Sequence, residues 1–168
     1  MPSLRQATTD DAELITQHRH MMFADNNLAS KQRYVEMDDK FLPWVTERIA
    51  DGRYVGILLE DQTNGQVLAS AGIYFMDFPP HYLDPEPIRA YLLNFYTAPE
   101  DRGMGYAKVL LGATVAECRR RGIGVITLHA SRFGKPIYEK FGFKHHNEYI
   151  LRPGEGPGSI DLNIIPNP

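Results

Sequence analysis

The chain has 168 residues, of which 43% are hydrophobic and 23% are charged, and its formal net charge is −3. This size and balance predict one globular domain over residues 1–168 and argue against a surface built to bind nucleic acid. The opening residues lack the apolar core of a signal peptide and no apolar run approaches a membrane span, so we expect a cytoplasmic protein with no nucleic-acid or membrane partner.

The amino-terminal half predicts a strand at residues 3–8 and a helix at 10–22, followed by a second helix that ends near residue 52. Two further strands are expected at 53–60 and 66–78. Asp10 and Glu13 fit an N-cap and its reciprocal glutamate at the start of the first helix. Pro43 is expected to restart the second helix at its first turn. Asn64 and Gly65 supply the positive φ angles of a hairpin turn, so the last two strands are expected to be antiparallel neighbours.

The carboxy-terminal half begins with a proline-rich loop, residues 79–87, which is poorly suited to a sheet interior. The pattern then predicts a strand, a helix, a strand, a helix and two strands, over residues 89–97, 104–121, 123–130, 134–141, 143–151 and, less strongly patterned, 159–165. A strand, helix and strand in succession form a crossover unit, so the fold class is predicted as α/β with a mixed sheet. The single cysteine, Cys118, lies in an apolar helical pattern, permits no disulfide or metal cluster, and is expected to be buried.

The segment RGMGYA, Arg102–Ala107, leads from a strand into a helix. Such a turn exposes backbone N–H groups that converge on one point, and its glycines let a ligand approach closely, so it predicts a phosphate or pyrophosphate site. The lysine and hydroxyl of a P-loop are missing, and Lys108 stands where a dinucleotide fingerprint needs its third glycine. A nucleotide enzyme that uses the turn in another way remains an open alternative.

The same segment resembles the acyl-CoA signature R/Q-x-x-G-x-G/A of the GNAT superfamily of N-acyltransferases, which Arg102, Gly105 and Ala107 match. A second block, ITLHASRFGKPIYEKFGF, is similar to the family's strand, turn and short helix ending in Tyr-x-x-x-Gly-Phe, here from Tyr138 to Phe143. The order of the expected elements also parallels that of the family over essentially the whole chain. The resemblance implies the GNAT fold, with the strand at 89–97 splayed from the following parallel strand, and acetyl-CoA as co-substrate.

By this resemblance, the pantetheine arm lies along the exposed backbone of the first splayed strand, and Ser131 contacts it. The turn holds the pyrophosphate, and Tyr138 lies near the sulfur as candidate general acid. A backbone N–H near Phe95 meets the oxyanion. The complete set of expected cofactor-binding residues is Phe95, Tyr96, Thr97, Arg102, Gly103, Met104, Gly105, Tyr106, Ala107, Ser131 and Tyr138.

The general base is not assigned. Many relatives carry a glutamate at the position of Tyr91, so a direct carboxylate base is in doubt. Asn94 cannot take a proton, although it could order a water or hold the amine. Glu86, His81 and a water chain remain alternatives. His129, in an apolar strand, is expected to be a core residue.

These residues predict an N-acetyltransferase that moves an acetyl group from acetyl-CoA to a primary amine of a small molecule or peptide, by direct attack in a ternary complex. The alternative is a non-catalytic acyl-CoA sensor on the same fold, favoured by the missing glutamate and opposed by Tyr138. The cluster Met21–Phe23 fits an acceptor pocket and plain core equally well. Relatives are often dimers, so a homodimer through the last strands is possible.

Overall fold

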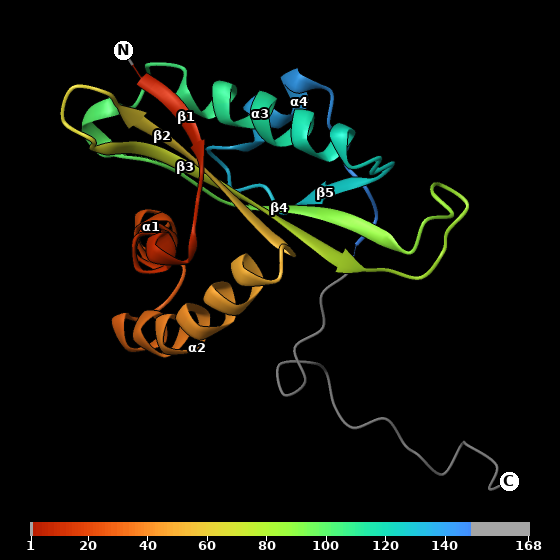
Figure 1. Ribbon diagram of the computed structural model, residues 1–168, viewed down its shortest axis with the longest axis horizontal. Coiled ribbons are helices and arrows are strands. Elements are labelled where there is room, and N and C mark those ends of the chain that lie inside the picture. The colour runs from red at the N-terminus through yellow and green to blue at the C-terminus, as the bar shows by residue number, and fades with distance from the viewer. Residues whose placement is uncertain (1, 149–168) are drawn as a thin grey trace, which may run out of the picture.

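The computed structural model describes residues 2–148, in which a five-stranded mixed sheet carries helices on both faces (Figure 1). In chain order the elements are β1 (Pro2–Gln6), a 3-10 turn (Thr9–Asp11), α1 (Ala12–Asp25), α2 (Lys31–Ala50), β2 (Tyr54–Asp61), β3 (Val67–Asp77), β4 (Ile88–Thr97), a second 3-10 turn (Pro99–Asp101), α3 (Tyr106–Arg120), β5 (Ile126–Leu128) and α4 (Lys135–Phe141). None of the helices within residues 2–148 has the length and apolar character needed to span a bilayer.

The strands lie in the order β1-β2-β3-β4-β5, so each strand neighbours the next one along the chain. The first four are antiparallel, and β5 joins β4 in parallel after the α3 crossover. The predicted hairpin between β2 and β3 is confirmed, with Gly65 at φ 71° in its turn. The α/β class with a mixed sheet is therefore confirmed.

The two faces of the sheet carry separate apolar cores, one under α1 and α2 and the other under α3. Val45 and Leu58 lie in the first core, and Ile73, Leu110 and Leu111 lie in the second, all of them almost fully buried. Burial removes their apolar surface from water and stabilises the layered arrangement. Cys118 lies in the second core, fully buried as expected, and this burial raises the pKa of its thiol to about 11.

Two expectations about the amino-terminal helices are wrong in detail. Pro43 does not restart a helix but lies inside α2, which runs unbroken from Lys31 to Ala50. Buried Phe41 and Val45 on either side of it hold the helix to the sheet, so packing outweighs the one missing N–H. The first cap also differs: Asp11, rather than Asp10, contacts the preceding residues, accepting a hydrogen bond from the Thr8 backbone N–H at 2.8 Å.

The structure also shortens the strands expected after α3. Strand β5 has three residues instead of the eight expected at 123–130, because it pairs with β4 only over that length. Residues 143–148 form no strand, contrary to expectation, and the rest of the strand expected at 143–151 lies outside the described residues. The candidate strand at 159–165 lies outside them entirely.

His18 on α1 gives a test of this packing. Its imidazole is buried, makes a 2.7 Å hydrogen bond between Nδ1 and the Ser70 hydroxyl, and lies against the Tyr96 ring. Burial lowers the pKa of His18 from 6.5 to about 4, so between these values the unfolded chain binds a proton that the folded chain does not. The free energy of unfolding is therefore expected to fall by up to about 3 kcal/mol as the pH drops from 6.5 to 4.

Replacement of His18 by glutamine should flatten this part of the stability profile, measured by urea unfolding at a series of pH values. The exposed His145 provides the control, since His145→Gln should keep the native slope. An unchanged slope in His18→Gln would contradict the assignment.

Candidate active site

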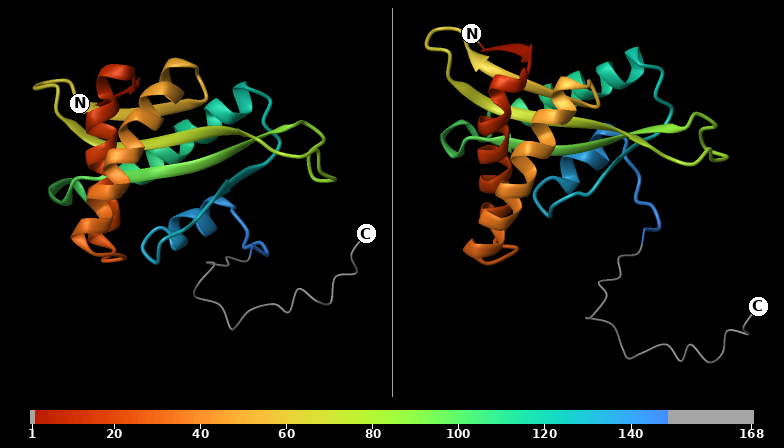
Figure 2. Two further views of the ribbon diagram at one scale, coloured as in Figure 1. Left: turned by 90° about the horizontal axis from the view of Figure 1, so that it is seen from below. Right: turned by 60° about the horizontal axis from the view of Figure 1, so that its bottom comes forward.

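The site is built on the divergence of β4 from β5. The two strands pair at only three positions, from Ala90 with Ile126 to Leu92 with Leu128, while β4 continues to Thr97. Figure 2 shows β5 and the α4 segment turning away from the far end of β4. The β4 backbone from residue 93 to 97 therefore has no strand partner on this side among the described residues, and its polar groups are free to bind an extended ligand.

The turn before α3 lies at the end of this opened strand. Gly103 and Gly105 have φ of 84° and 83°, which residues with a side chain rarely adopt. The backbone N–H groups of residues 103–107 donate to no acceptor within residues 2–148, and a Cβ added at either glycine would meet open space. Consecutive free donors at a helix N-terminus suit an anion, so the turn fits the pyrophosphate of acetyl-CoA.

Two other members of the expected set, Arg102 and Ser131, make contacts within the protein. The Arg102 guanidinium forms an ion pair with Asp25 at the end of α1, and its Nε donates to the Thr97 carbonyl at 3.2 Å. Ser131 shapes the turn before α4, its hydroxyl accepting a hydrogen bond from the Gly134 N–H at 3.1 Å. Met104 is two-thirds exposed at the tip of the glycine turn.

The Tyr-x-x-x-Gly-Phe block forms a helix end that positions Tyr138. Gly142 ends α4 with φ 114°, and the Phe143 N–H donates to the Tyr138 carbonyl at 3.0 Å, a pairing typical of a left-handed helix stop. The Tyr138 ring packs edge-on against Phe95 of β4 and against Phe143. Burial raises the pKa of its phenol to about 12, so the hydroxyl keeps its proton at neutral pH. A Cβ at Gly134 would lie 2.8 Å from this ring, so only glycine leaves it room.

On the other face of β4, Asn94 occupies a β-bulge. Together with Phe95 it lies opposite the single residue Ala71, and its φ is 57°. The Asn94 side chain is buried, accepting a 2.7 Å hydrogen bond from Arg19 and donating a 2.9 Å bond to the Tyr54 hydroxyl. Asn94 thus joins α1, β2 and β4, and its amide is engaged within the protein.

Tyr91 lies on the same face, since its cross-strand neighbour Tyr74 packs there against Trp44. Its hydroxyl is 2.6 Å from Nδ1 of His129, and Nε2 of His129 is 3.4 Å from a Glu148 carboxylate oxygen. His129 is exposed, so the expectation of a core histidine is wrong. Its position one residue beyond the end of β5 removes it from the apolar layer.

The other expected bases lie elsewhere. His81 and Glu86 belong to the loop before β4, where His81 accepts from the Leu83 N–H and the Glu86 N–H donates to Asp84. Asp84 also accepts from the Gly124 N–H at 3.0 Å, which fastens this loop to the segment before β5. Neither candidate contacts Tyr91, Asn94 or Tyr138. Within residues 2–148 no group of three or more histidine, cysteine, aspartate or glutamate residues is arranged to hold a metal ion.

The cluster Met21–Phe23 is half-buried at the carboxy-terminal end of α1, beside the β4 bulge. Met21 Sδ accepts a hydrogen bond from the Tyr96 hydroxyl at 2.9 Å, and the Phe23 ring contacts Arg19. An acceptor pocket therefore remains a prediction for this cluster.

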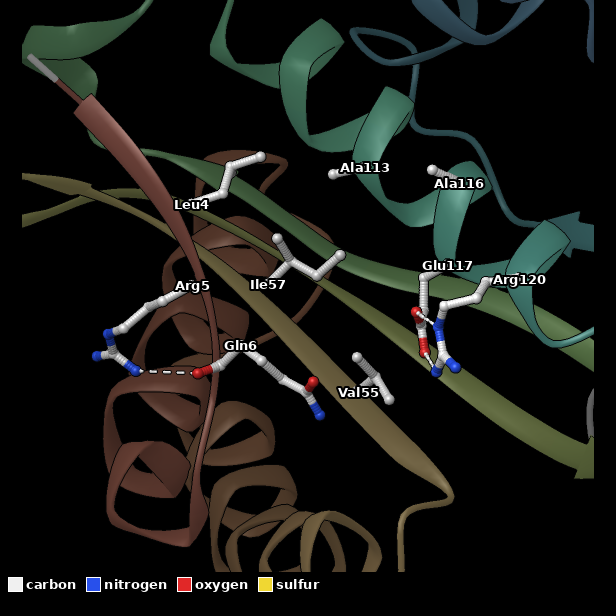
Figure 3. Close-up of a pocket in the computed structure, with 9 residues that line it drawn as sticks. All are labelled: Leu4, Arg5, Gln6, Val55, Ile57, Ala113, Ala116, Glu117 and Arg120. Atoms are coloured by element: carbon white, nitrogen blue, oxygen red, sulfur yellow. Dashed lines mark hydrogen bonds and ion pairs between the residues drawn. The ribbon is translucent and has the colours of Figure 1, made fainter.

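A groove of about 390 Å³ lies at the opposite edge of the sheet (Figure 3). It runs between β1, β2 and α3, and the close-up shows the Glu117 carboxylate paired with Arg120 at one side. Because β1 and β2 lie at the far edge from β5, this groove is separate from the opening beside β4. Its lining residues are Leu4, Arg5, Gln6, Val55, Ile57, Ala113, Ala116, Glu117 and Arg120.

The sequence model of the acetyltransferase (GNAT) family matches residues 15–143, which include the splayed strands, the glycine turn and Tyr138. The chain belongs to this family. A GCN5-related N-acetyltransferase from Ralstonia eutropha is 33% identical, with a TM-score of 0.85 over 90% of this chain and 98% of that chain. A predicted acetyltransferase from Clostridium acetobutylicum, solved with acetyl-CoA, is 31% identical, with a TM-score of 0.83 over 90% and 96%.

More distant GNAT structures share the fold alone. The glucosamine-6-phosphate N-acetyltransferase of Arabidopsis thaliana is 17% identical, with a TM-score of 0.64 over 90% of this chain and 97% of that chain. No curated protein matches the sequence. The GNAT assignment and its acetyltransferase class are thus established by the family match and the two closer structures.

Sequence reasoning missed the pairing of His129 with Tyr91 and the contact of Arg19 with Asn94. The first pair is 38 residues apart and the second 75, so no local motif indicates either. The one available signal for the contact of Arg19 with Asn94 was the presence of Asn94 in an otherwise apolar strand. A buried amide requires a hydrogen-bond partner.

The glycine turn can be tested by substitution. Gly105→Ala places a Cβ on a residue with φ 83°, at a cost of about 1 kcal/mol, and relief of this strain turns the free N–H groups away. Acetyl-CoA affinity, measured by calorimetry, is expected to fall about fivefold or more.

Gly112 inside α3 is the matched control. A Cβ there meets nothing and the residue is helical, so Gly112→Ala should keep the affinity while stabilising the helix. Equal affinity of the Gly105→Ala variant and the native protein would count against the turn as the pyrophosphate site.

Proposed function

We propose that this GNAT acetyltransferase transfers an acetyl group from acetyl-CoA to a primary amine by direct attack in a ternary complex. The observation that carries the proposal is the opening between β4 and β5, which has the free N–H groups of the turn at one end and Tyr138 against its wall. A thioester end placed in this opening lies between Tyr138 on one face of β4 and Tyr91 on the other. The amine would therefore approach the thioester carbonyl from the side opposite Tyr138.

The binding roles divide along the strand. The unpartnered backbone of Phe95, Tyr96 and Thr97 would hydrogen-bond the pantetheine arm, and the segment from Arg102 to Ala107 would hold the pyrophosphate. Ser131 would support this arm from the turn before α4. A backbone N–H near Phe95, beside the bulge, would stabilise the oxyanion of the tetrahedral intermediate.

Tyr138 would act as general acid. The amine nitrogen would bond to the thioester carbonyl carbon to give the tetrahedral intermediate, and on its collapse the C–S bond would break with its electron pair passing to sulfur. The Tyr138 hydroxyl would give its proton to the thiolate and regain one from solvent. Burial favours the protonated phenol, so the proton is present at neutral pH, while it also makes the phenol a weaker acid.

Proton removal from the amine would run through Tyr91 and His129. The Tyr91 hydroxyl would accept the amine proton while passing its own to His129 Nδ1, 2.6 Å away. His129 would release a proton from Nε2 toward Glu148 or solvent. Histidine suits this step because one ring nitrogen can accept a proton while the other releases one. Asn94 would serve as a positioning residue, since its amide fixes the bulge.

The function is tested by thiol release from acetyl-CoA over a panel of amino acids, amino sugars, aminoglycosides, polyamines and peptide N-termini. Turnover of at least one amine class supports the enzyme. Tight acetyl-CoA binding without turnover of any class would instead favour the sensor. A cytoplasmic location and a homodimer stay predictions, to be tested by fractionation and by light scattering.

Tyr138→Phe should lower kcat about 10²-fold or more and leave acetyl-CoA affinity unchanged, because only the proton donor is lost. Steady-state kinetics and calorimetry provide the two measurements. Tyr82, whose side chain is almost fully exposed in the loop before β4, gives the control Tyr82→Phe, which should behave as native. Native turnover in Tyr138→Phe would remove Tyr138 from the chemistry.

His129→Gln should lower kcat/KM about 10²-fold, because glutamine cannot take up the proton that Tyr91 passes to Nδ1. Steady-state kinetics with an accepted amine measures the loss. The exposed His145 again offers a control substitution. A native kcat/KM in His129→Gln would show that another group takes the proton.

A further inference from the structure

Arg19 on α1 is largely buried beside the β4 bulge without a carboxylate partner. Its guanidinium lies between the rings of Phe23 and Phe41, 4.9 and 4.7 Å from their centroids, and its Nη1 donates to Asn94 Oδ1. The buried Nε has no hydrogen-bond partner. The nearby Asp38 is held by His20 at 2.5 Å and lies beyond ion-pair distance of Arg19.

This arrangement is costly. A buried guanidinium loses its hydration, and a neutral amide oxygen and two aromatic faces offset only part of the loss. Burial accordingly lowers the pKa of Arg19, although an arginine stays charged at physiological pH. Two other arginines differ in having a carboxylate partner: Arg5 pairs with Asp11, and Arg48 pairs with Glu47 although its Nε is also unpaired.

The position of Arg19 connects it to the reaction. Its guanidinium hydrogen-bonds Asn94, three residues after Tyr91 on β4, and both residues lie on the face of the sheet that α1 covers. Arg19 therefore lies on the same side of β4 as Tyr91. Nη2 of Arg19 donates to no residue within 2–148 and is not fully buried, so it is free to donate to a ligand.

We propose that the acceptor is a compact primary amine that also carries an oxyanion group, a carboxylate or a phosphate, and that Arg19 binds this anion. The inference rests on the proposed acetyl transfer and names its substrate class. The anion would supply the ion-pair partner that Arg19 lacks within residues 2–148, and a charge-assisted hydrogen bond to Nη2 would hold it. With the anion held at Arg19, the amine of a short molecule would point toward Tyr91.

The test compares matched amines in the thiol-release assay. One arm uses α-amino acids and their primary amides, and the other uses phosphoethanolamine and ethanolamine, so the two arms distinguish carboxylate from phosphate. In at least one of these two comparisons, kcat/KM of the native enzyme should be about tenfold or more higher for the amine that carries the anion than for its neutral counterpart. Arg19→Met should reduce this preference to nearly one, mainly by raising KM for the anionic member.

Arg48→Met is the matched control, because Arg48 also lies over an aromatic ring, that of Trp44, but pairs with Glu47. It should retain the native preference. If Arg19 only held Asn94 in place, Arg19→Met would slow both members of a pair equally, and the proposal would fail. If the Arg19→Met variant does not fold, the preference for the anionic amine is compared between the native enzyme and the Arg19→Lys variant instead.

The two proposals can fail separately. Efficient turnover of the neutral amines with no preference for anions would overturn the role of Arg19 and leave the acetyltransferase intact. Absence of turnover with every amine would overturn the proposed function. In that case the anion site would be tested by thermal unfolding of the CoA-bound protein. The anionic amines should raise the unfolding temperature of the native protein and not that of the Arg19→Met variant.

Discussion

The separation of β4 from its parallel neighbour after Leu92 is the constraint on which the rest of the structure depends. A strand in the middle of a sheet normally uses both rows of backbone hydrogen-bonding groups, whereas the end of β4 is paired along only one row by the residues that the structure describes. The opening is maintained from both sides. The bulge at Asn94 bends the strand, while the Tyr138 ring of α4 packs against Phe95 on the other face of β4.

Helix α1 connects the two halves of the site. Through Asp25 at its last turn it holds Arg102 beside the glycine turn, and through Arg19 it holds Asn94 at the bulge. Six residues separate these two anchors, less than two helical turns. The cofactor side and the acceptor side are therefore positioned by one rigid element, and the placement of α1 on the sheet fixes the distance between them.

What the sequence could predict was what it encodes locally. The strand, glycine turn and helix around Gly105, and the helix stop at Gly142, follow from residue types within a few positions, and the structure forms both. The chemistry on the acceptor side joins distant segments, so the environments of Arg19 and His129 were not apparent. Pro43 is the opposite case, in which a local signal misled. Proline tends to interrupt a helix, but tertiary packing keeps α2 intact.

The burial of Cys118 has a practical consequence for experiments on this protein. It is the only thiol in the chain, lies fully enclosed on the buried face of α3, and has a pKa raised to about 11. The thiolate that reacts with disulfide dyes is scarce in the folded state. In such an assay the colour therefore measures the released coenzyme A with little background from the protein. Slow labelling of Cys118 would report the opening of the core.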